Sequence, residues 1–261
     1  MDLHLKGKAA LVTASSRGLG KAIAQELARE GCHVMLNGRD SQNLLSAARE
    51  IRQLTDSKIA TQVGDLTRHE DITALVERTR SAFGRIDILI NNCGGPPGGS
   101  FADFDDQQWQ SAFELTLLSY IRLIRACLND LRAAKGRIVN ITSSSIRQPI
   151  PHLVLSNVFR AGVLGLSKSL ADELAPDGVL VNTVAPGRIA TDRTHHLDGL
   201  KAERLKCSRE DVVREACKSI PLGRYGEPNE LAQVVAFLVS NVNTYLTGQA
   251  IAIDGGLVRA L

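Results

Sequence analysis

Residues 12–20 have the composition of a phosphate-binding turn. They read Val-Thr-Ala-Ser-Ser-Arg-Gly-Leu-Gly and join an apolar run, residues 9–12, to residues 21–28, whose apolar side chains recur every three to four positions. This pattern predicts a buried strand followed by an amphipathic helix. Glycine lets the backbone approach a pyrophosphate closely, and a helix N-terminus offers unpaired N–H groups and the positive end of its dipole.

The turn therefore indicates a dinucleotide site. Its candidate cofactor-binding residues are Thr13, Ser15, Ser16, Arg17, Gly18, Leu19 and Gly20. The usual G-x-G-x-x-G spacing is not met, and a helix cap without a ligand has similar residues, so a purely structural turn is the alternative interpretation.

The elements that must position this turn alternate along the whole chain. Apolar strands are predicted at 33–37, 58–63, 86–90, 137–141, 179–184 and 250–253, and helices at 41–54, 70–83, 106–133, 154–174 and 227–240. Strict alternation predicts an α/β fold with a parallel sheet covered on both faces, in one domain over residues 1–261. Ligands of such sheets collect at the carboxyl ends of the strands.

Two segments interrupt this alternation at the expected ligand edge. Residues 94–99 read Gly-Gly-Pro-Pro-Gly-Gly, which can continue neither a helix nor a strand and predicts a loop. Residues 191–219 are polar with charges of both signs. We expect them to form a pair of helices that act as a lid over the site.

The composition excludes several functional classes. The 261 residues are 44% hydrophobic and 23% charged, with a formal net charge of +3. So small a charge, without a basic stripe, argues against nucleic acid and membrane partners. The first residues have no apolar core and no later segment is long enough to span a bilayer, so a cytoplasmic protein is expected. The five cysteines form no C-x-x-C pair and the adjacent His195 and His196 lack a third ligand, which predicts no metal site.

Six motifs, taken in order, resemble those of the short-chain dehydrogenase/reductase family. They are Thr13–Gly20, Asp65–Thr67, Asn91–Gly94, Ile138–Ser143, Val181–Gly187 and Asp254–Gly256. The likeness covers the full length, and residues 221–228 and 246–249 look like the 3-oxoacyl-carrier-protein reductase branch. The resemblance implies a Rossmann-type, doubly wound sheet of about seven parallel strands and a nicotinamide cofactor. It also implies a homo-oligomer, a tetramer or dimer, that uses the long fourth and fifth helices.

The resemblance implies cofactor contacts beyond the first turn. These fall on Asp65, Leu66, Asn92, Cys93, Gly94, Arg160, Pro186, Gly187, Ile189 and Thr191. One departure lies in the turn itself, because Ala14 stands at the first glycine of the family pattern T-G-x-x-x-G-x-G. Alanine fits there if φ is negative, whereas a positive φ would force the turn to shift.

Two arginines favour NADP(H) over NAD(H). Arg17 lies beside the second glycine of that pattern, and Arg39 just past the second strand. Guanidinium groups suit a 2′-phosphate, whereas an acidic side chain would accept a hydrogen bond from the 2′-hydroxyl of NAD. Asp40 is the competing observation, since it follows Arg39 directly. A surface arginine without a ligand is the other interpretation of either residue.

The resemblance also implies a catalytic set, which this chain keeps only in part. In the family, Tyr transfers a proton to the carbonyl oxygen, Lys lowers the Tyr pKa and holds the nicotinamide ribose, Ser binds the substrate, and an Asn completes the set. Ser143 matches the serine. Ser156 stands at the tyrosine position, Arg160 at the lysine position and Thr116 at the asparagine position.

These replacements change the available chemistry. Ser156 and Arg160 are four residues apart, so a helix presents both on one face. A serine hydroxyl is shorter and far less acidic than a phenol, whose ordinary pKa is about 10. Arg160 cannot release a proton near neutrality, although its guanidinium could bind ribose hydroxyls or a substrate carboxylate.

A substitute for the missing acid is not obvious. None of the three tyrosines, Tyr120, Tyr225 and Tyr245, lies in a segment that the motif places at this site. His152, one turn before Ser156, is a candidate because histidine titrates in the useful range, whereas an exposed loop histidine is the plainer interpretation.

These observations support two hypotheses of function. The first is an oxidoreductase that binds NADP(H) and transfers hydride to or from a small carbonyl or alcohol substrate without the family's tyrosine. The alternative is a catalytically silent NADP-binding protein, a sensor or an oligomer partner.

Overall fold

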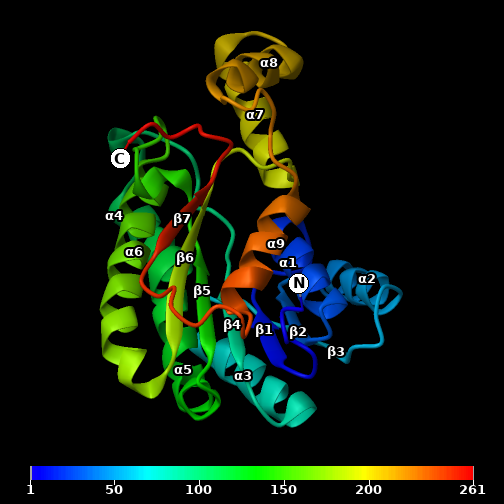
Figure 1. Cartoon of the computed structure of the whole chain (residues 1–261). Helices are drawn as coiled ribbons and strands as arrows, with labels where there is room; N and C mark the ends of the chain where they lie inside the picture. The colour runs from blue at the N-terminus through cyan, green and yellow to red at the C-terminus, as the bar shows by residue number, and fades with distance from the viewer. Residues whose placement is uncertain (1, 261) are drawn as a thin grey trace.

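Seven parallel strands form the centre of the protein, as the computed structural model of residues 2–260 shows (Figure 1). They are β1 (Ala9–Val12), β2 (His33–Gly38), β3 (Ile59–Val63), β4 (Ile88–Asn91), β5 (Arg137–Ile141), β6 (Leu180–Pro186) and β7 (Ala250–Ile253). Their order across the sheet is β3-β2-β1-β4-β5-β6-β7, and every neighbouring pair is parallel. The predicted α/β, Rossmann-type sheet is confirmed.

Helices cover both faces of this sheet. On one face lie α1 (Gly18–Arg29), α2 (Ser41–Arg52) and α9 (Pro228–Val239), and on the other lie α3 (His69–Phe83), α5 (Ser119–Ala134) and α6 (Val154–Leu174). The short helix α4 (Asp106–Phe113) precedes α5. Helix α6 ends at Leu174, as predicted, and Pro176 lies just past this end, since proline in a helix interior removes a backbone hydrogen bond.

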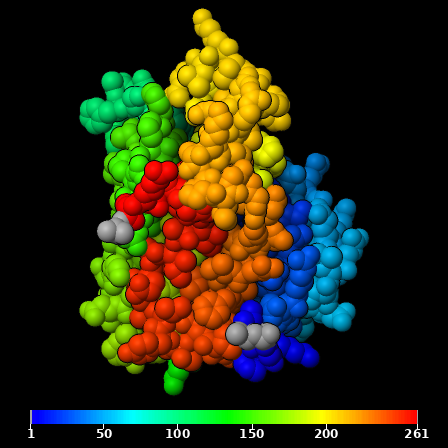
Figure 2. Space-filling view, turned by 45° about the horizontal axis from the view of Figure 1, so that its top comes forward, coloured from blue at the N-terminus to red at the C-terminus, as the bar shows by residue number. Residues whose placement is uncertain are grey.

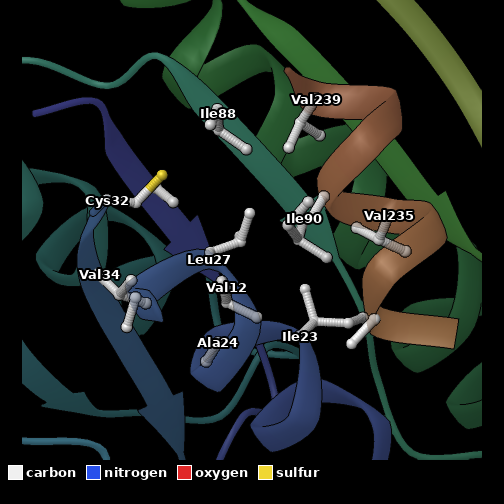
Figure 3. Packing of buried hydrophobic residues seen from close by; sticks show 14 of the residues in the cluster. Val12, Ile23, Ala24, Leu27, Cys32, Val34, Ile88, Ile90, Val235 and Val239 are labelled. Carbon is white, nitrogen blue, oxygen red and sulfur yellow. The ribbon is translucent and has the colours of Figure 1, made fainter. Parts of the chain in front are cut away.

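Alternate side chains of the central strands enter two separate cores. Val12 and Val34 pack with Ile23 of α1 and Val235 of α9 in the core that Figure 3 shows. Met35, next to Val34 in β2, points to the opposite core against α3 and α5. Burial on both faces explains why the strand sequences are continuous apolar runs.

The strand order reverses at β1. Val12 pairs with Leu36 of β2 on one side and with Ile90 of β4 on the other. The chain therefore leaves β1 and β4 in opposite directions, and a doubly wound sheet binds its ligands at this point of its carboxyl edge. The fold thus places the turn at residues 12–20 where a dinucleotide would bind.

The predicted helix over residues 106–133 is interrupted. A π-helical turn, η2 (Glu114–Leu118), separates α4 from α5. Such turns widen a helix locally and are frequent at functional sites. Thr116 lies in this turn, and η2 packs against α6. The prediction of one continuous α-helix was therefore wrong at residues 114–118, because apolar periodicity is too coarse to show a single wide turn.

Residues 191–219 form the predicted pair of helices, α7 (Asp192–Leu205) and α8 (Arg209–Ser219). In Figure 1 they project beyond the end of the sheet at which β6 finishes. Figure 2, in which this end comes forward, shows the yellow and orange segments between the green and the blue parts of the chain. No helix within residues 2–260 is long and apolar enough to cross a bilayer.

A buried carboxylate ties α7 to the body. Asp198 is 1% exposed, accepts a hydrogen bond from Arg188 Nη1 at 2.5 Å and another from the Tyr225 hydroxyl at 3.0 Å. The Arg188 guanidinium also lies 5.7 Å from the Tyr225 ring centroid. Burial, together with the hydrogen bond to Asp198, raises the pKa of Tyr225 to about 12, so its hydroxyl remains a donor near neutrality. We call this cluster, Arg188, Asp198 and Tyr225, the α7 anchor.

Candidate active site

The turn after β1 is held by its own polar side chains. The Thr13 hydroxyl donates to Asn92 O at 2.7 Å, and the Asn92 side chain donates to Ala14 O at 3.1 Å. The Ser15 hydroxyl donates to Val12 O at 2.8 Å and accepts from Asn37 N at 3.0 Å. Thr13, Ser15 and Asn92, expected as cofactor contacts, therefore use their side chains to shape the turn.

Asn37 is a residue of this turn that sequence reasoning missed. It is buried at the end of β2, accepts from Ala14 N at 3.2 Å and donates to Gly64 O at 3.2 Å. An amide both donates and accepts, so Asn37 can join the ends of three strands. A buried polar residue at the end of an apolar strand was the available signal.

The backbone of the turn is in the left-handed conformation at Ala14. Its φ is +44°, and that of Gly18 is +57°. A Cβ at Gly20 would lie inside contact distance of Ala14 O and 2.8 Å from Asn92 Nδ2. Glycine is therefore required at position 20, whereas Ala14 occupies a conformation that alanine adopts only with strain.

Replacing this strained alanine should stabilise the protein. The left-handed conformation costs a non-glycine residue about 1–2 kcal/mol, and the added unfolded-state entropy of glycine offsets about 0.4–1 kcal/mol. We expect Ala14→Gly to raise the free energy of unfolding by about 0.5–1 kcal/mol, measured by urea denaturation. The matched control Ala22→Gly, within α1, should lower it by about 1 kcal/mol. A lower free energy of unfolding in Ala14→Gly would contradict the conclusion that the backbone at Ala14 is strained.

The segment that follows β6, residues 187–191, lies next to the same turn. Thr191 begins α7, with its hydroxyl accepting from Thr194 N at 3.3 Å, and a Cβ at Gly18 would lie 3.9 Å from Thr191 Cβ. A Cβ at Gly187 would lie 2.5 Å from Asp254 Cβ, so this glycine permits a close approach of two chain segments. Pro186 and Ile189 are buried beside it. The structure thus brings the fifth and the sixth of the six motifs together and places Thr191 beside the first.

The charged groups past β2 take different roles. Arg17 and Arg39 are exposed at the carboxyl ends of the neighbouring strands β1 and β2. Arg39 Nη1 lies 3.7 Å from Asp65 Oδ2. Partial burial opposes ionisation of Asp65, but hydrogen bonds from Thr67 and the nearby Arg39 guanidinium lower its pKa overall. Asp40 instead caps α2 by accepting a hydrogen bond from Asn43 N at 2.7 Å. The carboxylate that could have bound the 2′-hydroxyl of NAD is therefore used as a helix cap.

Four more of the expected cofactor residues lie along this edge. Ser16 is partly exposed, and a Cβ at Gly38 would lie 3.1 Å from its hydroxyl. Leu66 is buried. Gly94 is exposed, and apart from its chain neighbours no atom of residues 2–260 lies within 4 Å of the place that a Cβ would take. Leu19 is partly buried against the core beneath α1.

Arg160 is the centre of the candidate catalytic region. Its guanidinium, on α6, donates to Ile141 O at 2.8 Å, to the Tyr120 hydroxyl at 3.1 Å and to Cys93 Sγ at 3.5 Å. The residue is 5% exposed. Burial works against its charge, but its contacts with Cys93 and Tyr120 raise its pKa overall, so Arg160 stays a cation. It joins the ends of β4 and β5 to α5 and α6.

Tyr120 is the second residue that sequence reasoning missed. It is fully buried on α5, and its hydroxyl donates to Ile141 O at 2.9 Å while it accepts from Arg160. Burial raises its pKa well above the ordinary value, so Tyr120 is a poor acid whose role is to position Arg160. Its place four residues after Thr116, on the same stretch of helix, was the signal that could have found it.

The other three candidate catalytic positions lie on elements around Arg160, and the hydrogen bonds of Arg160 described above reach none of them. Ser143 follows β5 and accepts from Ser145 N at 3.2 Å. Ser156 is half-buried on α6, one turn before Arg160. Thr116 is fully buried, and its Oγ1 has no hydrogen-bond partner among residues 2–260. An unpartnered buried hydroxyl is costly and usually points to a missing partner.

His152 lies apart from these groups. It is exposed with φ of +59°, and its Nδ1 lies 3.1 Å from the Ser100 hydroxyl. Its carbonyl accepts from Gly99 N at 2.8 Å. Its hydrogen bonds therefore attach the glycine-rich loop to the start of α6, and within the described part of the chain none reaches Ser143, Ser156 or Arg160.

A seven-stranded parallel sheet with a glycine turn at its switch point defines the class of Rossmann dinucleotide-binding proteins. Residues 13–258 match the family model described as Enoyl-(Acyl carrier protein) reductase. The 3-oxoacyl-(acyl-carrier-protein) reductase FabG of Chlamydia muridarum is 34% identical over 259 residues, which cover 98% of this chain and all of the relative. The chain therefore belongs to the short-chain dehydrogenase/reductase family, a family of oxidoreductases.

Solved structures agree with this membership. L-sorbose reductase from Gluconobacter frateurii, complexed with NADPH and L-sorbose, superimposes with a TM-score of 0.95 at 32% identity, with both chains fully covered. An NADPH-bound short-chain oxidoreductase from Pseudomonas aeruginosa, described as containing an atypical catalytic center, superimposes with a TM-score of 0.88 at 32% identity. That match covers 97% of this chain and 98% of the other.

Proposed function

We propose that this protein binds NADP(H) and transfers hydride between the nicotinamide and a small carbonyl or alcohol substrate. The observation that carries the proposal is the meeting of the β1 turn, Asn92 and Thr191 at the switch point of the sheet. Proteins of the same fold at 32% identity have been solved with NADPH bound.

The turn fits a dinucleotide. Apart from its chain neighbours, the only residue between 2 and 260 within 4 Å of a Cβ built at Gly18 would be Thr191, so the backbone there is free to approach a pyrophosphate. Arg17 and Arg39 are exposed beside it, and Asp40 is engaged as a helix cap. These features support a 2′-phosphate rather than a free 2′-hydroxyl.

We expect NADPH to bind more tightly than NADH. Arg39→Asp should reduce the ratio of the NADH to the NADPH dissociation constant, because it removes a charge-assisted contact with the 2′-phosphate. One such contact contributes about 1.5–3 kcal/mol. Calorimetric titration of both nucleotides measures the effect. Arg49→Asp, an exposed arginine on α2, is the matched control and should leave the preference unchanged. Equal affinities in the native protein would contradict the assignment.

The chain's own residues then act as follows. The cofactor supplies or accepts the hydride when it is bound. Ser143 donates a hydrogen bond to the substrate oxygen, and the Arg160 cation stabilises negative charge that develops there. Arg160 cannot itself release a proton, so Ser156, on the same face of α6, passes one from water to that oxygen. Tyr120 holds Arg160 in place through the hydrogen bond at 3.1 Å.

A screen of ketones and alcohols, followed at the absorbance of reduced nicotinamide, tests this function. We expect slow NADPH-dependent reduction of at least one ketone class, since cofactor and substrate positioning remain while the family's acid is absent. Ser143→Ala should lower that rate further without changing NADPH affinity. Tight NADPH binding without turnover of any substrate would contradict hydride transfer.

The second candidate function is a catalytically silent NADP-binding protein. The observation in its favour is that the one tyrosine near Arg160 is fully buried, with its hydroxyl engaged by Ile141 O. Such a protein would bind NADPH with normal affinity and change its stability or assembly on binding. The substrate screen distinguishes the two functions.

We also propose a homo-oligomer. The family resemblance implies an interface on α4–α5 and α6. In support, Phe101, next to these elements, and Val158, on α6, are 74% and 48% exposed. Light scattering at micromolar concentration should give a dimer or tetramer mass.

A further inference from the structure

Arg193 connects α7 to the glycine-rich loop at residues 94–99. Its Nη2 donates to Pro96 O at 2.9 Å, and a Cβ at Gly95 would lie 3.1 Å from the same nitrogen. This loop is in turn attached to the start of α6, because Gly99 N donates to His152 O and Val154 N donates to Gly99 O. Arg193 therefore joins the first turn of α7 to a loop that also contacts the start of α6, the helix that carries Ser156.

The charge of Arg193 adds to that of Arg160. Arg160 contacts Cys93 and Arg193 contacts Pro96, so both cations lie against the same segment after β4. Partial burial, and then the positive charge of Arg160, lower the pKa of Arg193. Bringing two like charges together over one site costs free energy. Such an arrangement is stable when a ligand of opposite charge binds between them.

Neither cation has an acidic partner. Within residues 2–260, no carboxylate oxygen lies within 4.0 Å of the guanidinium of Arg160 or Arg193. By contrast, Arg188, on the segment that leads to α7, is paired with the buried Asp198. The hydrogen-bond partners of Arg160 and Arg193 are two carbonyls, a hydroxyl and a thiol, all of them neutral groups. Arg160 is 5% exposed, so the cost of burying a cation without a counter-ion falls on it, whereas Arg193 is exposed and is the cation that a ligand can reach.

We infer that the substrate is a carbonyl compound that carries a carboxylate, which Arg193 binds while Arg160 faces the reacting end. The guanidinium presents two parallel N–H groups that match the two oxygens of a carboxylate. Arg193 retains exposed surface and donors beyond the one that binds Pro96 O, so it can bind this group without losing its loop contact. This inference rests on the proposed function and names its substrate class as oxo acids.

The cofactor phosphates are the competing source of negative charge. Arg193 lies two residues past Thr191, which is close to Gly18. If Arg193 binds the pyrophosphate, its removal weakens NADPH binding and leaves substrate selection unchanged. The two sources therefore make opposite predictions for one variant.

The test compares acids with their esters. Acetoacetate, levulinate and 5-oxohexanoate, and the methyl ester of each, are titrated by calorimetry onto the protein saturated with NADP⁺, and their reduction is followed with NADPH. We expect at least one acid to bind about 10-fold or more tightly than its ester. Arg193→Met should abolish this difference and leave the NADPH dissociation constant unchanged. Arg204→Met, an exposed arginine on the same helix, is the matched control and should behave as the native protein.

Each outcome decides one question. Equal binding of acids and esters, or an acid preference that survives in Arg193→Met, overturns the carboxylate inference. Loss of NADPH affinity in Arg193→Met with the acid preference intact assigns the arginine to the cofactor and overturns it as well. Acid-selective binding that Arg193→Met abolishes, without any turnover, supports the carboxylate-binding role of Arg193 but contradicts hydride transfer, so the failure of the proposed function can be told from the failure of the carboxylate site.

Discussion

The triple variant Thr116→Asn, Ser156→Tyr, Arg160→Lys is expected to reduce ketones with a kcat/KM about 10²–10⁴-fold above that of the native protein, because a positioned general acid contributes a factor of this size. Positions 156 and 160 already share one face of α6, and position 116 lies in the π-helical turn that packs against this helix. A phenol at 156 with a lysine one turn later would restore the proton donor that the native serine and arginine do not supply.

The measurement is the steady-state rate of NADPH consumption with the ketone screen. The matched control carries the changes at 116 and 160 together with Ser169→Tyr, which places the same phenol on an exposed part of α6. This control should show no gain. If the triple variant folds, binds NADPH and still gains no activity on any ketone, the acid is not the missing element. If the native protein turned over ketones at the ordinary enzyme rates of about 1–10³ s⁻¹, the conclusion that its site lacks an effective proton donor would be wrong.

Asp198→Ala is expected to lower the free energy of unfolding by about 3 kcal/mol, because removal of one partner of a buried ion pair leaves the other charge uncompensated and costs about 3–5 kcal/mol. The low end applies because Arg188 keeps 30% of its side chain exposed while Asp198 is buried. The Tyr225 hydroxyl also loses its acceptor, so the whole α7 anchor is broken. Urea denaturation measures the loss, and hydrogen exchange should show faster exchange in α7 than in α6.

Two variants make this result specific. Glu203→Ala, on an exposed position of the same helix, should change stability by less than about 0.5 kcal/mol. Asp198→Asn keeps an acceptor for Tyr225 but removes the charge, so its loss should fall between those of the other two. If Asp198→Ala and Glu203→Ala are equally stable, the anchor contributes little and α7 is held by other contacts.

The position of α7 also affects the two functional proposals. Arg193 lies in the first turn of this helix and Thr191 caps it, so both depend on the anchor for their place over the sheet edge. Asp198→Ala should therefore weaken NADPH binding and oxo-acid binding together. Arg193→Met is expected to weaken only the second.

The sequence by itself determined the elements and the edge at which they act. Apolar runs and three-to-four-residue periodicity are local properties, and so they predicted α6 and β7 at their observed bounds. Strict alternation of strands and helices then required a parallel sheet with its ligands at the carboxyl ends. The motifs added the family and the positions of Ser143, Ser156 and Arg160.

The tertiary structure decided which polar groups meet. Tyr120 and Arg160 are 40 residues apart in the sequence and Pro96 and Arg193 are 97 apart. Their contacts depend on how α5, α6 and α7 pack, which no local pattern contains. The left-handed φ of Ala14 likewise follows from the close approach of Gly20 and Asn92 to the turn. Long-range packing, rather than residue type, thus made Tyr120 a support for Arg160 and Arg193 a cation without an acidic partner among residues 2–260.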